Sequence, residues 1–338
     1  MTKYIVRRIL WSIPVLIALT FAVFALMRAI PGGPFDFVGD KSLPAAVVQN
    51  LERKYHLDEP LWKQFARYLV GDFVDTMDIR DFGKGGLLRG DLGVALRQRG
   101  RTVNDIVAES LPISVQLGVL AMIVSVFLGI TTGTIAALRQ NTIIDYASTL
   151  LAIVGVSIPE LVLGPLLIWI LALKLDWFPV ATWGASYPFI LGFLPKPTSK
   201  FFLHAALPVF SLGIAHSASI CRLTRASLLQ VIREDYIRTA RAKGLREWVV
   251  IARHALKNSL IPVVTVIGPL AAAILTGTFV VEHIFGIPGM GKHFVDSIGN
   301  RDYPLIVGVT LIYAIFLVIA NLIVDITYAW LDPRIRYE

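Results

Sequence analysis

The chain has 338 residues, of which 55% are hydrophobic and only 17% are charged, against about 25% charged residues in soluble domains. Its mean hydropathy of +0.67 means that most apolar surface faces lipid, which excludes an ordinary soluble enzyme. Cys221 is the only cysteine, so an intrachain disulfide and a cysteine-rich metal site are also excluded.

Six stretches are apolar and long enough to cross a hydrocarbon layer of about 30 Å, which requires roughly 20 helical residues. The first follows Lys3, Arg7 and Arg8, as in a signal peptide, but its apolar run is too long and no cleavage site follows. We expect it to remain as an uncleaved first helix. The prediction is an all-α membrane protein with six transmembrane helices near residues 9–29, 113–138, 143–173, 203–220, 260–281 and 305–329.

The basic residues of the short loops predict the orientation, because cytoplasmic loops carry an excess of Lys and Arg. With the N-terminus inside, the inner segments hold fifteen such residues and the two short outer loops hold five. Both termini are therefore expected in the cytoplasm. This asymmetry explains most of the net charge of +8, so we expect no nucleic-acid partner.

Four parts of the chain follow from this topology. Residues 1–30 form the first transmembrane helix, and residues 31–112 form an extracytoplasmic region with amphipathic helices. Residues 113–329 form a core of five transmembrane helices. This core contains the cytoplasmic loop 222–259, and residues 330–338 form a cytoplasmic tail.

Segment 286–293, GIPGMGKH, matches the start of a phosphate-binding loop, G-x-x-x-x-G-K. We reject nucleotide binding here because His293 stands where Ser or Thr should hold magnesium, and because no strand precedes the segment. In addition, no helical pattern opens at the lysine, and the predicted topology places the segment outside the cell. A tight turn at the end of a span is the preferred interpretation.

Ser157 and His216 lie on different spans, as the catalytic pair of an intramembrane serine protease would. Ser157 lacks the small-residue nucleophile loop of such enzymes, and we expect its hydroxyl to bond the backbone that Pro159 frees. The six histidines are scattered, without a ligand spacing typical of a metal site. We therefore expect neither a catalytic residue nor a metal site.

Ionisable residues inside spans are costly and indicate function. Glu160, directly after Pro159 near the middle of the third span, could line a water-filled path and meet a cationic group of a solute. It could also lie at the outer interface or pair with a neighbouring subunit. His216 and Asn321 could face the same path or bond neighbouring helices. Arg28 and Asp325 lie near span ends, and we expect them to act as anchors.

The loop 222–259 is basic, favours helix on both sides of Gly244 and runs directly into the next span. We predict an elbow, defined as two short helices of this loop that meet at Gly244. A short rigid helix presented by a tight turn suits docking into a separate ATPase, although a solvated basic face is an equal alternative. The residues assigned to docking are Asp235, Tyr236, Arg238, Thr239, Ala240, Arg241, Ala242, Lys243, Gly244 and Leu245.

At this loop the sequence resembles a known family. The segments DYIRTARAKGL and RHALKNSLIP are similar to the cytoplasmic coupling loop of ABC-transporter inner-membrane permeases, in the wording of the dipeptide/oligopeptide branch. The general permease signature is E-A-A, three residues, Gly, nine residues and I-x-L-P. Aligned on Gly244, the chain departs from it, with Arg238 and Thr239 at the Glu and first Ala, and His254 and Lys257 at the Ile and Pro.

The resemblance covers nearly the whole chain, because ESLPISVQLG, GVSIPELVLG, FGIPGMG and NLIVDITYAWLDPRIR also look like family segments in the family order. Gly33 replaces the usual Asp of the P-G-D-P ending after the first span. The outer segment 71–89 looks longer than in typical members. Together these segments are highly specific, although none would be alone.

The resemblance implies the type I fold of ABC importer permeases and the role of a B-type permease subunit. It implies a heterodimer with a second, related permease, two cytoplasmic ATPases that bind ATP and magnesium, and an extracytoplasmic solute-binding protein. The chain itself would hold no cofactor and no catalytic residue. It would lie in the inner membrane of a prokaryote.

The resemblance favours di- or oligopeptides as the solute, but similar permeases handle nickel, glutathione or sugars. A stand-alone secondary transporter is a more remote alternative. It would require ion-coupling carboxylates at the midplane, and no carboxylate other than Glu160 lies near the middle of a predicted span.

Overall fold

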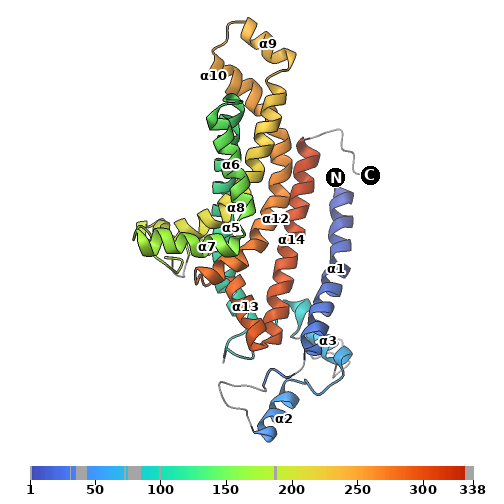
Figure 1. The fold of residues 1–338 in the computed structure, drawn as a ribbon. Helices are drawn as coiled ribbons and strands as arrows, with labels where there is room; N and C mark the ends of the chain where they lie inside the picture. The colour runs from blue at the N-terminus through green and yellow to red at the C-terminus, as the bar shows by residue number, and fades with distance from the viewer. Residues whose placement is uncertain are drawn as a thin grey trace. The chain divides into compact units, whose positions relative to one another are not determined.

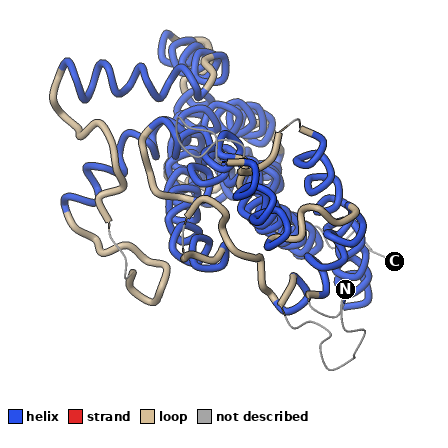
Figure 2. Tube along the Cα trace, turned by 90° about the horizontal axis from the view of Figure 1, so that it is seen from below, coloured by secondary structure: helices blue, strands red, loops and turns tan. Residues whose placement is uncertain are grey.

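The computed structural model describes residues 2–30, 32–35, 44–71, 74, 85–98, 100–185 and 189–331. Within these ranges the chain is helical, apart from loops and two isolated β-bridges (Figure 2). Contacts divide it into two units. Of the described residues, unit 1 holds 112–288 and 317–331, and unit 2 holds 2–111 and 289–316. The division by membrane side made from the sequence is a different partition and stays a prediction.

The long helix α8, Ser199–Val231, is the central element of unit 1 and packs against α6, α7 and α12 (Figure 1). The hydroxyl of Thr198 caps its start by accepting a hydrogen bond from the Phe201 amide at 3.2 Å. The remaining elements of the unit, in chain order, are the end of α5 (Val103–Leu138), α6 (Ile143–Ser157), α7 (Glu160–Leu167), the π-helix η2 (Ile168–Lys174), α9 (Asp235–Ala242), α10 (Glu247–Val249), the π-helix η3 (Val250–Leu256), α11 (Lys257–Ser259), α12 (Ile261–Ile284) and the end of α14 (Tyr303–Leu331).

Small residues let α5 and α8 approach closely. A Cβ atom built on Gly129 would lie 2.5 Å from Ile220 Cβ, and one on Gly133 would lie 2.5 Å from the Cys221 carbonyl oxygen. Glycines four residues apart on one helix face are typical of tightly packed membrane helices. The packing of this pair therefore depends on the absence of side chains at these two positions.

The predicted third span, 143–173, is not a continuous helix. It is broken after Ser157, and α6 and the helix that begins at Glu160 are bent by 106°. Pro159 has no amide hydrogen, and the residue before a proline is driven to extended backbone, as Ile158 is with φ −86° and ψ 116°. The hydropathy of this segment identifies it as apolar, but hydropathy contains no information about a break in the helix.

Unit 2 contains α1 (Thr2–Ala29), the amphipathic helices α2 (Ala45–Lys54) and α3 (Leu61–Val70), the short 3₁₀ helix η1 (Leu87–Arg89), the start of α5, α13 (Met290–Asn300) and the start of α14. Its core joins Val103, Ile106 and Met290. The Asp302 carboxylate accepts hydrogen bonds from the amides of Leu96 and Arg97, both at 3.1 Å. Most of the outer segment 71–89 lies outside the described residues.

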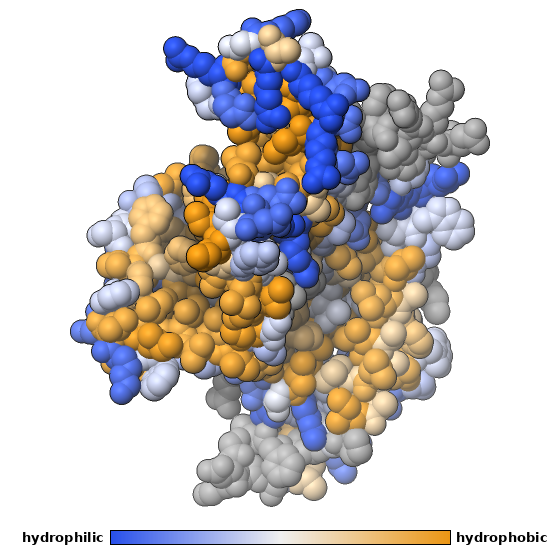
Figure 3. All heavy atoms as spheres, turned by 45° about the horizontal axis from the view of Figure 1, so that its top comes forward, coloured by the Kyte–Doolittle hydropathy of each residue, from blue (hydrophilic) through white to orange (hydrophobic). Residues whose placement is uncertain are grey.

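In the part of the chain that the structure describes, four helices are long and apolar enough to cross a membrane: Tyr4–Ala29, Val103–Leu138, Ser199–Val231 and Tyr303–Ile323. Two bent helix pairs raise the possible number to six. The all-α membrane fold is thus confirmed, and the count of six spans stays a prediction. Figure 3 shows hydrophilic atoms gathered at the end of unit 1 that holds α9 and α10, next to a broad apolar surface.

Candidate functional site

The elbow predicted in the loop 222–259 is present in the structure. Helix α9 ends at Ala242, and a new helix begins at Glu247. Gly244 between them has φ +74°, in the left-handed region that side chains other than glycine disfavour, and no atom lies within 4 Å of a Cβ built there. The turn therefore depends on backbone freedom at Gly244 and not on packing.

The elbow is anchored by one apolar face. Ile237 is fully buried and Ala240 nearly so. Both belong to a cluster with Ala137 and Leu228, at the ends of α5 and α8, and with Val250. Helix α9 is therefore packed directly on the ends of two long helices.

The opposite face of the elbow is exposed, and side-chain hydrogen bonds connect its parts. The Arg241 guanidinium donates to both carboxylate oxygens of Glu247, at 2.7 and 3.2 Å, across the Gly244 turn. The Asn258 amide donates to the Tyr236 hydroxyl at 2.9 Å. The exposed members of the predicted docking set are Asp235, Tyr236, Arg238, Thr239, Arg241, Ala242, Lys243, Gly244 and Leu245, to which the structure adds the 68% exposed Trp248.

Glu160 and His216, two of the predicted path residues, meet at the break in the third span. Glu160 begins α7, and its Oε1 lies 3.4 Å from His216 Nε2, with each side chain about one-fifth exposed. That nitrogen makes no hydrogen bond within the described part of the chain. The arrangement is a loose, partly accessible carboxylate–imidazole pair beside irregular backbone.

Ser157 does not join His216. Its hydroxyl donates to the Ile153 carbonyl at 2.7 Å, one turn earlier. The acceptor is the Ile153 carbonyl and not that of Gly155, which is the carbonyl that Pro159 leaves without a helical donor. The structural role of Ser157 stays a prediction.

Asn321, the third predicted path residue, is half-buried in α14, and no described contact joins it to Glu160 or His216. Arg28, expected to reach outward as an anchor, instead folds over the Phe24 ring, 3.5 Å from its centroid. The structure thus brings together two of the three path candidates.

Two ionisable sites were not predicted. Asp145 on α6 is 2% exposed and accepts two hydrogen bonds from Arg225 of α8, at 2.6 and 2.7 Å. Glu282 is fully buried. It was not predicted because the predicted span ended at residue 281, whereas α12 continues to Ile284. A carboxylate within an apolar helical run is a signal that could have identified Glu282. No spacing signal connects Asp145 with Arg225, 80 residues away.

At segment 286–293 the structure differs from the expectation that no helix opens at the lysine. Helix α13 begins at Met290, so a helix does open around Lys292. The substitution of His293 for Ser or Thr still separates this segment from a nucleotide-binding loop. Gly286, with φ +60°, forms the turn that follows α12. No group of three or more metal-ligating side chains gathers among the described residues.

Comparison with known proteins gives a consistent result. Residues 129–337 match the family described as binding-protein-dependent transport system inner membrane component, and residues 1–118 match the corresponding N-terminal family. The dipeptide transport system permease protein DppB of Bacillus subtilis is 41% identical over 336 residues, covering 99% of this chain and 98% of that protein.

The oligopeptide transport system permease protein OppB of Escherichia coli K12 is 41% identical over 338 residues, with both chains fully covered. OppB of Haemophilus influenzae is 39% identical over 337 residues, again with both chains fully covered. A crystal structure of an amino acid ABC transporter with histidines covers 66% of this chain and 92% of its own, at 15% identity and a TM-score of 0.48.

Proposed function

Because this chain belongs to the family of binding-protein-dependent transport system inner membrane components, we propose that it carries di- or oligopeptides inward across a prokaryotic inner membrane. It is a multi-pass membrane protein and a permease subunit of an ABC importer, and its family is one of transport proteins, not of catalysts. The proposal of peptide as solute rests on relatives of about 40% identity over their full length, all named as dipeptide or oligopeptide permeases.

In this proposal the elbow receives the conformational change of two cytoplasmic ATPases, which bind ATP and magnesium. The observation that carries it is the geometry of α9, which has one face buried on the ends of α5 and α8 and another fully exposed. Exposed Tyr236, Leu245 and Trp248 offer apolar anchors that a cleft of the ATPase would bury.

The Glu160–His216 pair lines the solute path in this proposal. Irregular backbone at membrane depth is tolerated where it borders a water-filled cavity, and the break at Pro159 is such a place. A carboxylate there attracts the ammonium group that every unmodified peptide carries. The second half of the path comes from a related permease in a heterodimer. A solute-binding protein delivers peptide from outside, and both termini lie in the cytoplasm.

The test is purification of the tagged chain from its native membrane, mass spectrometry of its partners and an ATPase assay in proteoliposomes. We expect two ATPases, a second permease, and ATP hydrolysis stimulated by a peptide-loaded binding protein. Stimulation by nickel, glutathione or sugar in place of peptide would reassign the solute within the family. A chain that purifies alone and moves solute without ATP would contradict the importer mechanism and favour a secondary transporter.

A further inference from the structure

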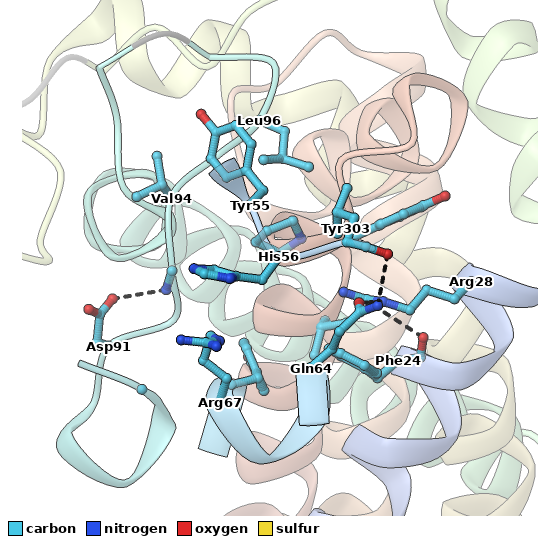
Figure 4. Close-up of a pocket in the computed structure, with 16 residues that line it drawn as sticks. Phe24, Arg28, Tyr55, His56, Gln64, Arg67, Asp91, Val94, Leu96 and Tyr303 are labelled. Atoms are coloured by element: carbon cyan, nitrogen blue, oxygen red, sulfur yellow. Dashed lines mark hydrogen bonds between the residues drawn. The ribbon is translucent and has the colours of Figure 1, made fainter. Parts of the chain in front are cut away.

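A cavity of about 240 Å³ lies in unit 2, beside the C-terminal end of α1 (Figure 4). Its wall includes Arg28, His56, Arg67, Tyr68 and Asp91. Drug-sized ligands occupy pockets of roughly 300–1,000 Å³, so this space suits a smaller group. In Figure 4 the Arg28 and Asp91 side chains lie on opposite sides, with His56 and Arg67 between them.

The hydrogen-bond partners of the Arg28 guanidinium are neutral groups. Its Nε donates to Gln64 Oε1 at 2.6 Å, and Nη1 lies 3.4 Å from the Phe24 carbonyl oxygen. No carboxylate of the described residues lies within 4 Å of it. A partly buried cation without an opposite charge is costly, and an anion supplied from outside would offset that cost.

The other cations of this wall already have a carboxylate. Arg67 lies 3.1 Å from Glu59 Oε1, and His56 Nδ1 lies 3.6 Å from the same oxygen. Hydrogen bonds from Lys63 and Arg67 hold the pKa of Glu59 below its ordinary value, so this carboxylate stays charged. Arg28 is therefore the cation of the wall that the described carboxylates leave unmatched.

Asp91 is the reverse case. Its Oδ1 accepts a hydrogen bond from the Gly93 amide at 2.9 Å, and no basic side chain of the described residues lies within 4 Å of the carboxylate. The cavity thus presents a partly buried, unmatched cation on one side and, on the opposite side, the carboxylate of the exposed Asp91 without an ion pair among the described residues. Such a pair fits a small ligand that carries both charges.

Tyr68 adds a hydrogen-bond donor. Its hydroxyl is buried and has no hydrogen-bond partner among the described residues. Burial, with the Asp91 carboxylate nearby, raises the pKa of Tyr68 above its ordinary value, so the hydroxyl keeps its proton. A buried donor without an acceptor is costly, and an acceptor oxygen of a ligand would offset that cost.

The depth of the cavity favours a lipid as the source of this ligand. Helix α1 is long and apolar enough to span a membrane, and Leu10, Trp11 and Leu26 are among its many exposed apolar side chains. Arg28 lies in the last turn of this helix. Side chains at such a position lie at the level of the lipid headgroups.

We propose that this cavity binds the zwitterionic headgroup of a phosphatidylethanolamine molecule. Its phosphate lies against Arg28 and the Tyr68 hydroxyl, and its ammonium lies against Asp91. The lipid's acyl chains continue along the exposed apolar side of α1.

Native mass spectrometry of the full chain, with any co-purified partners, tests the proposal against added phosphatidylethanolamine and phosphatidylglycerol. We expect at least about tenfold weaker retention of phosphatidylethanolamine in Arg28→Gln, since hydrogen bonds to charged groups contribute roughly 1.5–3 kcal/mol. Arg8→Gln is the matched control, because Arg8 is a charge near the opposite end of the same helix and does not line the cavity; its Nη1 donates to the Tyr4 hydroxyl at 2.6 Å. Equal retention in both variants would overturn the proposal.

Two gentler variants separate the parts of the headgroup. Tyr68→Phe removes only the hydroxyl and should weaken retention of both lipids. Asp91→Asn keeps the acceptor for Gly93 but loses the charge, and should shift preference from phosphatidylethanolamine toward phosphatidylglycerol. An unchanged preference would overturn the role of Asp91. Displacement of the lipid by soluble phosphoethanolamine or by a dipeptide at equal concentration would overturn the lipid as the ligand.

Discussion

Glu160 stands where the third span loses its helical continuity, 3.4 Å from His216. Glu160→Gln keeps the size of the side chain and removes its charge, so we expect about tenfold weaker apparent affinity for peptides, since charged hydrogen bonds contribute roughly 1.5–3 kcal/mol. Uptake of labelled peptides by proteoliposomes measures this, with Glu160→Asp as the control that retains the charge. Uptake curves that overlay those of the unaltered chain for several peptides would make Glu160 a structural residue.

Asp145 and Arg225 join α6 to α8 by two short hydrogen bonds, with Asp145 buried. Asp145→Asn leaves the arginine without its charge partner, and breaking a buried pair typically costs about 3–5 kcal/mol. We expect a clear fall in the Tm of the detergent-solubilised protein. The double variant Asp145→Asn with Arg225→Gln should recover part of that loss, and additive losses would contradict direct coupling.

These residues mark the limit of inference from sequence at this scale. Glu160 and His216 could be selected because an ionisable group in an apolar run is visible in the sequence. The proximity of Glu160 to His216 could not be predicted from the sequence, because it depends on the bend after Ser157. The Asp145–Arg225 pair could not be selected at all, since each residue looks like an ordinary charge at a helix end.

At the scale of elements, the elbow was predictable because its signals are local: helix-favouring residues, a central glycine and a following span. The break in the third span was not predictable, because an apolar run with a proline fits a kinked helix as well as two separate helices. Helix α13 was missed because its eleven residues are short and mixed in polarity, and they follow a loop rich in Gly and Pro.

Gly244→Pro should abolish ATP-driven uptake while leaving the spans inserted. Proline fixes φ near −65°, whereas Gly244 has φ +74°, so the substitution must rebuild the turn that presents α9. Co-purification of the ATPases and ATP-driven peptide uptake measure the effect. Lys257→Ala, which alters an exposed basic residue of the same loop outside the docking set and leaves the turn unchanged, is the control. Normal uptake in Gly244→Pro would refute the role of the elbow.

Gly133→Ala should lower stability by about 1–3 kcal/mol, the usual cost of overpacking, because the added methyl group would meet the backbone of α8. Gly299→Ala is the matched control in a helix where no atom lies within 4 Å of the new Cβ. There the same change should leave stability equal or raise it by up to about 1 kcal/mol. Thermal unfolding in detergent compares the two, and equal shifts would show that α5 and α8 do not depend on this close approach.

At the scale of the whole molecule, the distribution of charge decides which side of the membrane each loop occupies. The loop 222–259, which contains the elbow, carries nine of the fifteen basic residues of the inner segments, whereas the segment around α13 carries only Lys292 and Arg301. The positive-inside rule therefore predicts that α9 lies in the cytoplasm and α13 outside. Docking of cytoplasmic ATPases on the elbow requires this orientation.

A cysteine-labelling experiment tests that orientation. Replacing the buried Cys221 by Ala gives a cysteine-free background, to which Lys243→Cys in the elbow and Gly299→Cys in α13 are added singly. Both positions are exposed. A membrane-impermeant maleimide should label Gly299→Cys in intact spheroplasts but reach Lys243→Cys only after the membrane is disrupted, and the cysteine-free chain should stay unlabelled. The reverse pattern would place the elbow outside, where no ATPase could bind it, and would invalidate the coupling mechanism together with the predicted topology.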